Sequence, residues 1–266
     1  MENVQLAMQN VSVFYGQRPV IDNVTLSITP GKTTVVLGSS GSGKSILLKT
    51  LAGLVPANRG SVMFNRKNIF SLSEDEELHF RRISSFVFQD AALWANRTVS
   101  QNVHFPLEVH YPSISFEERD RKVKGYLQRV GYQDSLDYRP SQISTGEQKM
   151  VSLARALITD PEFLFLDSPL VGIDSSDAGN IVDIIKKLRS DGKTLLASLI
   201  DPELISLLAD ELIIIHKGAV LIQGPFTEVR RSSDPLIQRI LTLVLDQAAA
   251  YDEDILSLLD DNGGLL

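Results

Sequence analysis

The sequence contains no cysteine among its 266 residues, which excludes disulfide bonds and metal sites built on thiolates. Its four histidines are scattered and show no metal-ligand spacing. The net charge is −7, whereas nucleic-acid binding needs concentrated lysine and arginine. No apolar run approaches the roughly 20 residues of a membrane-spanning helix, and the N-terminus has no basic-then-apolar signal pattern. We therefore expect a chain that is soluble by itself, binds no nucleic acid, and reaches a membrane only through a partner.

What is present is the composition of an ordinary globular protein, with 43% hydrophobic and 22% charged residues. Apolar runs at 33–37, 163–167 and 194–199 are typical of buried strands. Between the last two, an apolar stripe from Ile181 to Leu188 predicts a helix that Gly192 terminates. Alternating strands and helices predict an α/β fold, with a mostly parallel sheet covered on both faces.

Two regions depart from this alternation. The chain from about 72 to 158 is more helical, and there Ser115 and Glu118 form a capping-box pattern ahead of one helix. The last forty residues begin with a helix predicted over 234–250, with Leu236, Ile240, Leu243 and Val244 in register, and end in an acidic tail over 251–266. Whether this apolar stripe packs within the chain or against a second copy is open at this point.

A glycine-rich string with the spacing G-x-x-x-x-G-K-S follows the strand at 33–37 and precedes a helix predicted over 44–54. Such backbone can direct several N–H groups at phosphates, and the helix N-terminus adds positive potential. Lys44 would reach the β- and γ-phosphates, and Ser45 would ligate Mg²⁺. A Gly/Ser surface turn is the alternative, and the strand–loop–helix context argues against it. The predicted nucleotide-binding residues are Gly38, Ser39, Ser40, Gly41, Ser42, Gly43, Lys44 and Ser45.

A second string, Ile143-Ser-Thr-Gly-Glu-Gln148, resembles the LSGGQ signature that marks the ATP-binding cassette (ABC) family among P-loop proteins. In that family two cassettes close face to face around ATP, and each signature serves the nucleotide of the opposite protomer. The resemblance implies this role in trans for Ser144, Thr145, Gly146, Glu147 and Gln148.

The resemblance to ABC nucleotide-binding subunits covers about residues 4–230. It implies a P-loop NTPase of ABC type, with a mostly parallel core sheet, an antiparallel β-subdomain and a helical signature subdomain at about 90–160. It divides the chain into a nucleotide-binding domain, 1–230, and a C-terminal helical extension with an acidic tail, 231–266. ATP and Mg²⁺ are the cofactors that it implies.

Four further positions match the family pattern. Phe163–Asp167 resembles the Walker B strand, whose terminal Asp holds Mg²⁺ through water; any buried strand can look so, but this one ends 23 residues after Ser144. Gln89 matches the Q-loop glutamine that senses the γ-phosphate and the metal. Tyr15 stands where the family stacks an aromatic ring on adenine, with a core tyrosine as the alternative. Asp174 occupies the D-loop, which crosses to the other protomer. The implied metal residues are Ser45, Gln89 and Asp167.

Three positions depart from the pattern. Ser168 replaces the glutamate that polarises the attacking water, Ile200 replaces the switch histidine, and Thr145 replaces the first signature glycine, which would loosen the closed dimer. A serine hydroxyl cannot act as a base near neutral pH, and losing a positioned base costs about 10²–10⁴ in rate. Of the catalytic positions Gln89, Ser168 and Ile200, the last two are therefore degenerate. We expect an ABC-type ATPase that binds ATP well and hydrolyses it weakly, unless a nearby carboxylate, Asp174 or Glu203, substitutes.

The segment after Gln89, residues 92–107, resembles the ATPases of Mla/Mce-type lipid transporters, as does the tail at 234–240. This subtype implies coupling of ATP to lipid movement, with phospholipid as the expected cargo, through membrane permease subunits. An Mce-domain protein is a further candidate partner, and the expected place is cytoplasmic, on the inner face of the cell membrane. Trp94 is a candidate contact for the permease, or else a core residue.

Other readings remain open here. The chain could energise import of another small molecule, or it could be a regulatory ATP-binding module with little turnover. A soluble ABC protein of DNA repair or translation is a third reading, against which the acidic balance counts. The paired cassettes form either a homodimer or a heterodimer with another ABC ATPase subunit.

Overall fold

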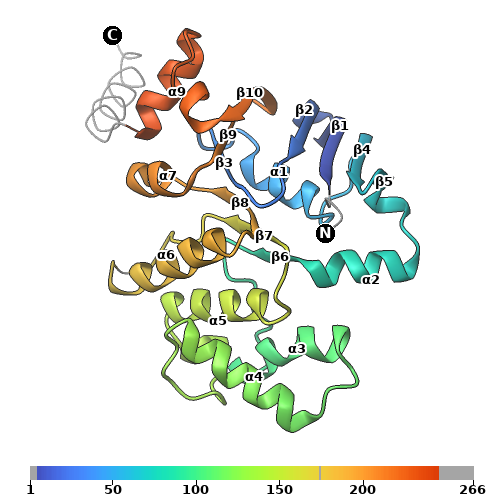
Figure 1. Ribbon diagram of the computed structural model, residues 1–266, viewed down its shortest axis with the longest axis vertical. Helices are drawn as coiled ribbons and strands as arrows, with labels where there is room; N and C mark the ends of the chain where they lie inside the picture. The colour runs from blue at the N-terminus through green and yellow to red at the C-terminus, as the bar shows by residue number, and fades with distance from the viewer. Residues whose placement is uncertain (1–4, 174, 246–266) are drawn as a thin grey trace, which may run out of the picture.

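The computed structural model describes residues 5–173 and 175–245 (Figure 1). A six-stranded sheet runs through its centre in the order β10-β9-β3-β8-β7-β6. All neighbours in it are parallel except the terminal pair, in which β10 runs antiparallel to β9. The strands are β3 (Thr33–Leu37), β6 (Ser84–Val87), β7 (Phe163–Asp167), β8 (Thr194–Ser198), β9 (Glu211–His216) and β10 (Ala219–Pro225). The predicted mostly parallel core sheet is therefore confirmed.

A second, antiparallel sheet lies to one side, at the upper right of Figure 1, in the order β2-β1-β4-β5. Its strands are β1 (Leu6–Tyr15), β2 (Arg18–Ile28), β4 (Arg59–Phe64) and β5 (Lys67–Asn68). Together the two sheets and the surrounding helices match the fold class predicted from the sequence.

Side chains that alternate along the central strands divide the core into two clusters. On β3, Val35 and Leu37 join a cluster with helices α5 (Thr145–Leu157), α6 (Ser175–Ser190), α7 (Pro202–Leu208) and α9 (Pro235–Leu245). Val36 joins a cluster with helix α1 (Lys44–Leu51) and the antiparallel sheet. Successive residues of a strand point to opposite faces. Both faces of the parallel sheet are thus buried, which is why its strands are apolar throughout rather than alternating.

The helical end of the molecule lies at the bottom of Figure 1 and contains α3 (Val99–His110), α4 (Phe116–Arg129) and α5 (Thr145–Leu157). Thr98 and Ser144 cap α3 and α5 with complete capping boxes. At α4 only half of the predicted box forms, because Ser115 accepts from the Glu118 N–H at 3.2 Å without a return bond from the Glu118 side chain. A short 3₁₀ turn (Pro140–Gln142) precedes α5.

The C-terminal part of the described chain contains α6 (Ser175–Ser190), α7 (Pro202–Leu208), α8 (Phe226–Val229) and α9 (Pro235–Leu245). Helix α9 buries Ile237, Ile240 and Leu241 within the chain and contacts α7. The predicted stripe was partly wrong, because Leu236 is exposed and the buried face is rotated from it. Intrachain packing therefore accounts for this face, and the remainder of the predicted helix and the acidic tail lie outside the described residues.

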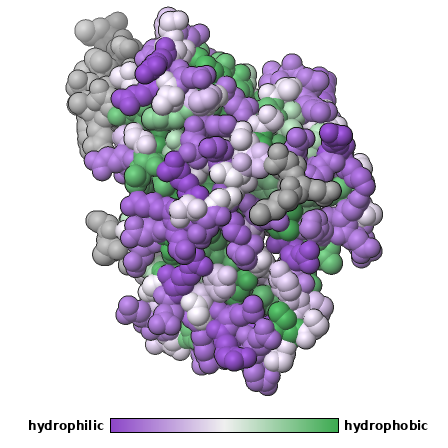
Figure 2. All heavy atoms as spheres, viewed as in Figure 1, coloured by the Kyte–Doolittle hydropathy of each residue, from purple (hydrophilic) through white to green (hydrophobic). Residues whose placement is uncertain are grey.

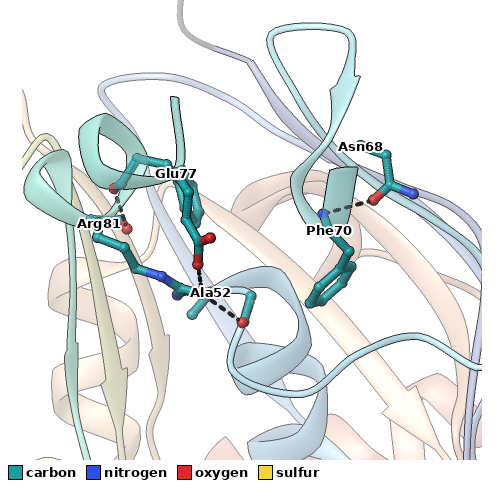
Figure 3. A network of polar contacts seen from close by, with 8 residues as sticks. Ala52, Asn68, Phe70, Glu77 and Arg81 are labelled. Atoms are coloured by element: carbon teal, nitrogen blue, oxygen red, sulfur yellow. Dashed lines mark hydrogen bonds and ion pairs between the residues drawn. The ribbon is translucent and has the colours of Figure 1, made fainter. Parts of the chain in front are cut away.

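Helix α1 (Lys44–Leu51) is shorter than predicted, and Figure 3 shows why its end is well defined. Arg81, on α2 (Glu74–Ile83), donates to the carbonyls of Ala52 at 2.9 Å and Gly53 at 3.0 Å. A cation at a helix C-terminus satisfies free carbonyls and complements the dipole. Gly53 then turns the chain with a φ of 68°, so the helix cannot continue to Leu54.

The acidic run Glu74–Glu77 lies on α2, largely exposed as predicted, and Glu76 completes a capping box with Ser73. In Figure 3, Asn68 likewise accepts from the Phe70 N–H at 3.1 Å and caps the 3₁₀ turn Ile69–Ser71.

The face of the molecule seen in Figure 2 is mainly hydrophilic, and hydrophobic residues form patches among the hydrophilic ones. In the described part of the chain, no helix combines the length and apolarity that crossing a bilayer requires.

Candidate functional site

The glycine-rich loop joins β3 to α1, and its backbone leaves no room for side chains at two positions. A Cβ on Gly38 would lie 2.2 Å from the Ile215 carbonyl oxygen, and one on Gly43 would lie 2.7 Å from that of Val20. The Lys44 Nζ donates to the carbonyls of Gly38 at 2.7 Å and Ser39 at 3.0 Å. The loop thus curls around the ammonium. Burial lowers the pKa of Lys44, while the nearby Asp167 carboxylate opposes that shift.

Asp167 ends β7 and is only 2% exposed. Its Oδ1 accepts hydrogen bonds from Ser45 Oγ at 2.9 Å and Ser198 Oγ at 3.0 Å. Carboxyl ends of parallel strands meet at one edge of a sheet, which brings β7, β8 and the loop after β3 together. A hydroxyl and a carboxylate in contact at the start of a helix are the hard oxygen donors that Mg²⁺ prefers. The residues present therefore fit the metal that the sequence predicted.

Ser168, directly after Asp167, is held in the left-handed backbone region with a φ of 48°. Its N–H donates to Ser198 Oγ at 2.9 Å, and its carbonyl lies 3.4 Å from the Lys149 ammonium. Ile200, two residues after β8 ends, is 66% exposed. Both positions line a cleft of about 520 Å³ whose other walls come largely from α6 and α7. A serine hydroxyl and an isoleucine side chain are not bases near neutral pH, and the expected degeneracy of these two catalytic positions stays a prediction.

Two carboxylates were predicted as possible substitutes for the missing base. Glu203 lines the same cleft as Ser168, and its role as a base stays a prediction. Asp174, the D-loop residue, lies outside the described residues. Asp201 also faces the cleft, but its Oδ1 accepts from the Leu204 N–H at 3.0 Å and caps α7.

The signature residues begin α5. Ser144 is the N-cap: its Oγ accepts from the Glu147 N–H at 3.1 Å, and its own N–H donates to the Glu147 carboxylate at 2.7 Å. Thr145 follows as the first helical residue and Gly146 is buried. The Gln148 amide turns inward and donates to the carbonyls of Pro140 and Ile143. Among the described residues, no hydrogen bond joins this segment to the phosphate loop of the same chain.

Two further predicted residues are exposed. Tyr15, at the end of β1, is 63% exposed, so the core alternative is wrong. Gln89 follows Phe88 and is exposed just beyond β6.

Sequence reasoning missed Lys149, which is 4% exposed and reaches the carbonyls of Phe88 at 3.5 Å and Ser168 at 3.4 Å. Burial lowers its pKa, against the attraction of Asp167 and Asp90. Its signal in the sequence was a lysine beside the apolar stripe of the signature helix.

Trp94 is not a core residue, since it is 40% exposed and lines a second cleft of about 490 Å³. Its ring meets that of Phe105 edge-on at 4.5 Å, and the Arg155 guanidinium lies 5.7 Å from it. Burial lowers the pKa of Arg155 to about 10, opposed by Asp90. The ionisable residues that line this cleft are all basic or histidine, namely Arg81, His110 and Arg155. Within the described ranges, no group of three or more His, Asp or Glu is placed to hold a metal by itself.

A parallel sheet with a phosphate loop at its carboxyl edge defines a P-loop nucleotide-binding protein. The family model described as ABC transporter matches residues 21–171. The chain is 32% identical over 246 residues to the L-cystine import ATP-binding protein TcyC of Bacillus subtilis, covering 91% of this chain and 99% of that protein. It is 30% identical over 241 residues to the intermembrane phospholipid transport system ATP-binding protein MlaF of Escherichia coli, covering 90% and 89%.

Among solved structures, the dimeric structure of MJ0796, a bacterial ABC transporter cassette, superposes with a TM-score of 0.76 at 30% identity, covering 83% of this chain and 98% of that one. The chain therefore belongs to the ABC transporter family, as an ATP-binding subunit. A cystine importer and a phospholipid system match it at similar identity, so the expected Mla-like subtype is not specifically supported.

Proposed function

We propose that this subunit binds ATP and Mg²⁺ at the loop Gly38–Ser45 and couples that binding to a membrane permease, with slow hydrolysis. The observation that carries the proposal is the contact between Ser45 Oγ and Asp167 Oδ1 at 2.9 Å, directly beside the serine that replaces the expected glutamate. This contact supports a metal site made of a hydroxyl and a carboxylate, whereas the neighbouring position, Ser168, offers only a hydroxyl to an attacking water.

The roles of the binding residues follow from their chemistry. Lys44 would exchange its carbonyl partners at Gly38 and Ser39 for phosphate oxygens, a change to stronger charge-assisted bonds. Ser45 and Asp167 would hold the metal, and Gln89, exposed beyond β6, is free to approach it. Mg²⁺, when bound, neutralises charge on the β- and γ-phosphates. The exposed ring of Tyr15 is available to stack on adenine.

Hydrolysis should be slow because the attacking water lacks a base. The Ser168 hydroxyl lies 3.3 Å from Ser198 Oγ and cannot accept a proton near neutral pH. Ile200 cannot hydrogen-bond to the γ-phosphate. Steady-state ATPase of the assembled transporter, compared with a Lys44→Ala assembly, tests this. Robust turnover that depends on Lys44, with no second ATPase in the complex, would show that the site is catalytically competent.

Pairing of two cassettes is supported by where the signature lies. Ser144 and the phosphate loop share no hydrogen bond within the described chain, and the Ser144 hydroxyl sits at the positive end of α5, which suits an anion from a partner. The similar ABC transporter cassette MJ0796 has a dimeric structure. A homodimer or a mixed dimer with another ABC ATPase satisfies the arrangement equally.

The cleft around Trp94 supports a permease contact, because aromatic rings and two arginines line it without any carboxylate. An apolar segment that carries an acidic residue would complement it. We place the subunit on the cytoplasmic, inner face of the cell membrane through that contact. Trp94→Ala should release the subunit from purified membranes and leave ATP binding unchanged. If the variant stays on the membranes at the parent level, this cleft is not the permease contact.

For the cargo we favour phospholipid, because the segment 92–107 resembles lipid-transporter ATPases and one relative belongs to a phospholipid system. An Mce-domain protein would then complete the complex. The second candidate is import of a small polar molecule, since another relative at similar identity serves cystine import. Mass spectrometry of the complex isolated with this subunit, followed by parallel lipid-transfer and cystine-uptake assays on it, separates the two.

A further inference from the structure

A buried hydroxyl on β8 lies at the centre of the site and is absent from the sequence-based residue set. Ser198 is 1% exposed and is the register partner of Asp167 on the neighbouring strand β7. Its Oγ donates to Asp167 Oδ1 at 3.0 Å and accepts from the Ser168 N–H at 2.9 Å. One side chain thus bridges the metal-binding carboxylate and the residue that follows it.

We propose that Ser198 is a positioning residue for the metal site: it fixes the Asp167 carboxylate for Mg²⁺ and holds the Ser168 peptide in its left-handed conformation. The inference rests on the proposed function, because it concerns the same ATP and Mg²⁺ site. It adds a residue that touches neither nucleotide nor metal and acts through Asp167.

Two hydroxyl groups hold the Asp167 carboxylate in its orientation. Asp167 Oδ1 accepts from Ser45 and from Ser198. Mg²⁺, when bound, would also use the Ser45 oxygen as a ligand, so Ser45 would serve both the metal and the carboxylate. Ser198 is the donor to Asp167 that would not itself bind the metal, and losing such an outer partner typically lowers metal affinity 10–100-fold.

Two side chains, Ser198 and Lys149, hold the strained backbone of Ser168. A serine with a φ of 48° is unfavourable unless its surroundings hold it there. The Ser198 hydroxyl holds the Ser168 N–H, and the Lys149 ammonium lies 3.4 Å from the Ser168 carbonyl. The hydroxyl groups of Ser168 and Ser198 also lie 3.3 Å apart. A longer side chain at position 168 would place its polar end beyond this contact.

The test measures metal binding rather than turnover. Mn²⁺, as a spectroscopic substitute for Mg²⁺, is titrated by EPR into the full chain saturated with a non-hydrolysable ATP analogue. The variants are Ser198→Ala, Ser198→Cys, which keeps a weak donor, and the control Thr194→Val. Thr194 is a buried hydroxyl on the same strand whose Oγ1 accepts from the Gly31 N–H at 2.9 Å, away from Asp167. Nucleotide affinity without metal is measured in parallel.

We expect Ser198→Ala to weaken Mn²⁺ binding about tenfold or more, Ser198→Cys to weaken it less, and Thr194→Val to stay within about twofold, all with metal-free nucleotide affinity unchanged. Parent-level metal affinity in a folded Ser198→Ala protein would overturn the proposal. If that variant does not fold, parent-level affinity in Ser198→Cys overturns it. A parent chain that binds no nucleotide at all would instead refute the proposed function.

Discussion

The candidate site has two adjoining parts that differ in their side-chain chemistry. The first corner, proposed to bind phosphate and metal, contains Lys44, Ser45 and Asp167, and the second corner, where a water would be activated, contains Ser168 and Ile200. In the first, Lys44, Ser45 and Asp167 each make hydrogen bonds of 3.0 Å or shorter. In the second, Ser168 and Ile200 face an open cleft with a short hydroxyl and an exposed apolar side chain. This difference in side-chain chemistry is why we propose that ATP binding and ATP hydrolysis are separable in this subunit. Of the three groups in the first corner, Asp167 is buried and Lys44 and Ser45 are half-buried, whereas Ile200 in the second corner is exposed.

Restoring the second corner should produce the largest effect. Ser168→Glu combined with Ile200→His supplies a base and a γ-phosphate contact, and should raise ATP turnover by about 10²–10⁴. Steady-state phosphate release from the assembled transporter measures it. Ser168→Gln with Ile200→His is the matched control, because glutamine has the length of glutamate but cannot act as a base at position 168. An equal gain in both variants would mean that geometry, rather than proton transfer, limits the parent.

Damaging the first corner comes next. Lys44→Ala removes a cation that would form charge-assisted hydrogen bonds to phosphate, and such bonds contribute about 1.5–3 kcal/mol. ATP affinity should fall by about 10–100-fold, as measured by calorimetry. Lys49→Ala on the same helix is the control, since its ammonium lies over the Phe88 ring at 5.9 Å. The comparison fails if both variants bind ATP equally well.

The signature serine should show a double effect that an ordinary cap does not. Ser144→Ala and Ser115→Ala each remove an N-cap hydroxyl bonded to an N–H at 3.1 and 3.2 Å, and each should cost about 1 kcal/mol of stability. Only Ser144→Ala should also weaken ATP-dependent dimerisation, followed by analytical ultracentrifugation. If the two variants dimerise alike, Ser144 is merely a cap.

The ion pair between Arg189 and Asp210 lies outside both corners, and breaking it should have the smallest effect, on stability alone. Partial burial raises the pKa of Asp210, but hydrogen bonds from Arg189 at 2.7 Å and the Thr33 N–H at 2.9 Å outweigh it, and the net pKa is lowered. The folded state therefore binds this proton less readily than the unfolded state. Its stabilisation is complete above the unfolded pKa of about 3.9 and is lost as the pH falls through the folded value.

Asp210→Asn should consequently lower stability at pH 7 by about 1 kcal/mol, and the difference from the parent should shrink below pH 4. Urea unfolding at several pH values measures it, and nucleotide affinity should not change. A constant difference at all pH values would mean that the amide disrupts packing rather than the ion pair.

The sequence predicted the candidate site more fully than it predicted the ends of the helices and strands. The site residues could be predicted from the phosphate loop, the signature string and the strand ending in Asp167, because each motif needs specific residue types at fixed offsets. The end of α1 was missed because it depends on Arg81, nearly thirty residues later in the chain. The buried face of α9 was partly missed because its neighbours, not its own periodicity, select which side is covered.

What the sequence by itself determined is which residue types stand at the motif positions: a glycine-rich loop with Lys44 and Ser45, an aspartate at the end of a buried strand, and Ser168 and Ile200 where the family pattern has glutamate and histidine. Those properties belong to residue identities and local spacing. What only the tertiary structure decided is which groups meet: Ser198 with Asp167 across β7 and β8, Lys149 with Ser168, and Trp94 with the cleft rather than the core. Such contacts join residues far apart in the chain, and strand order and packing, which no local pattern encodes, fix them.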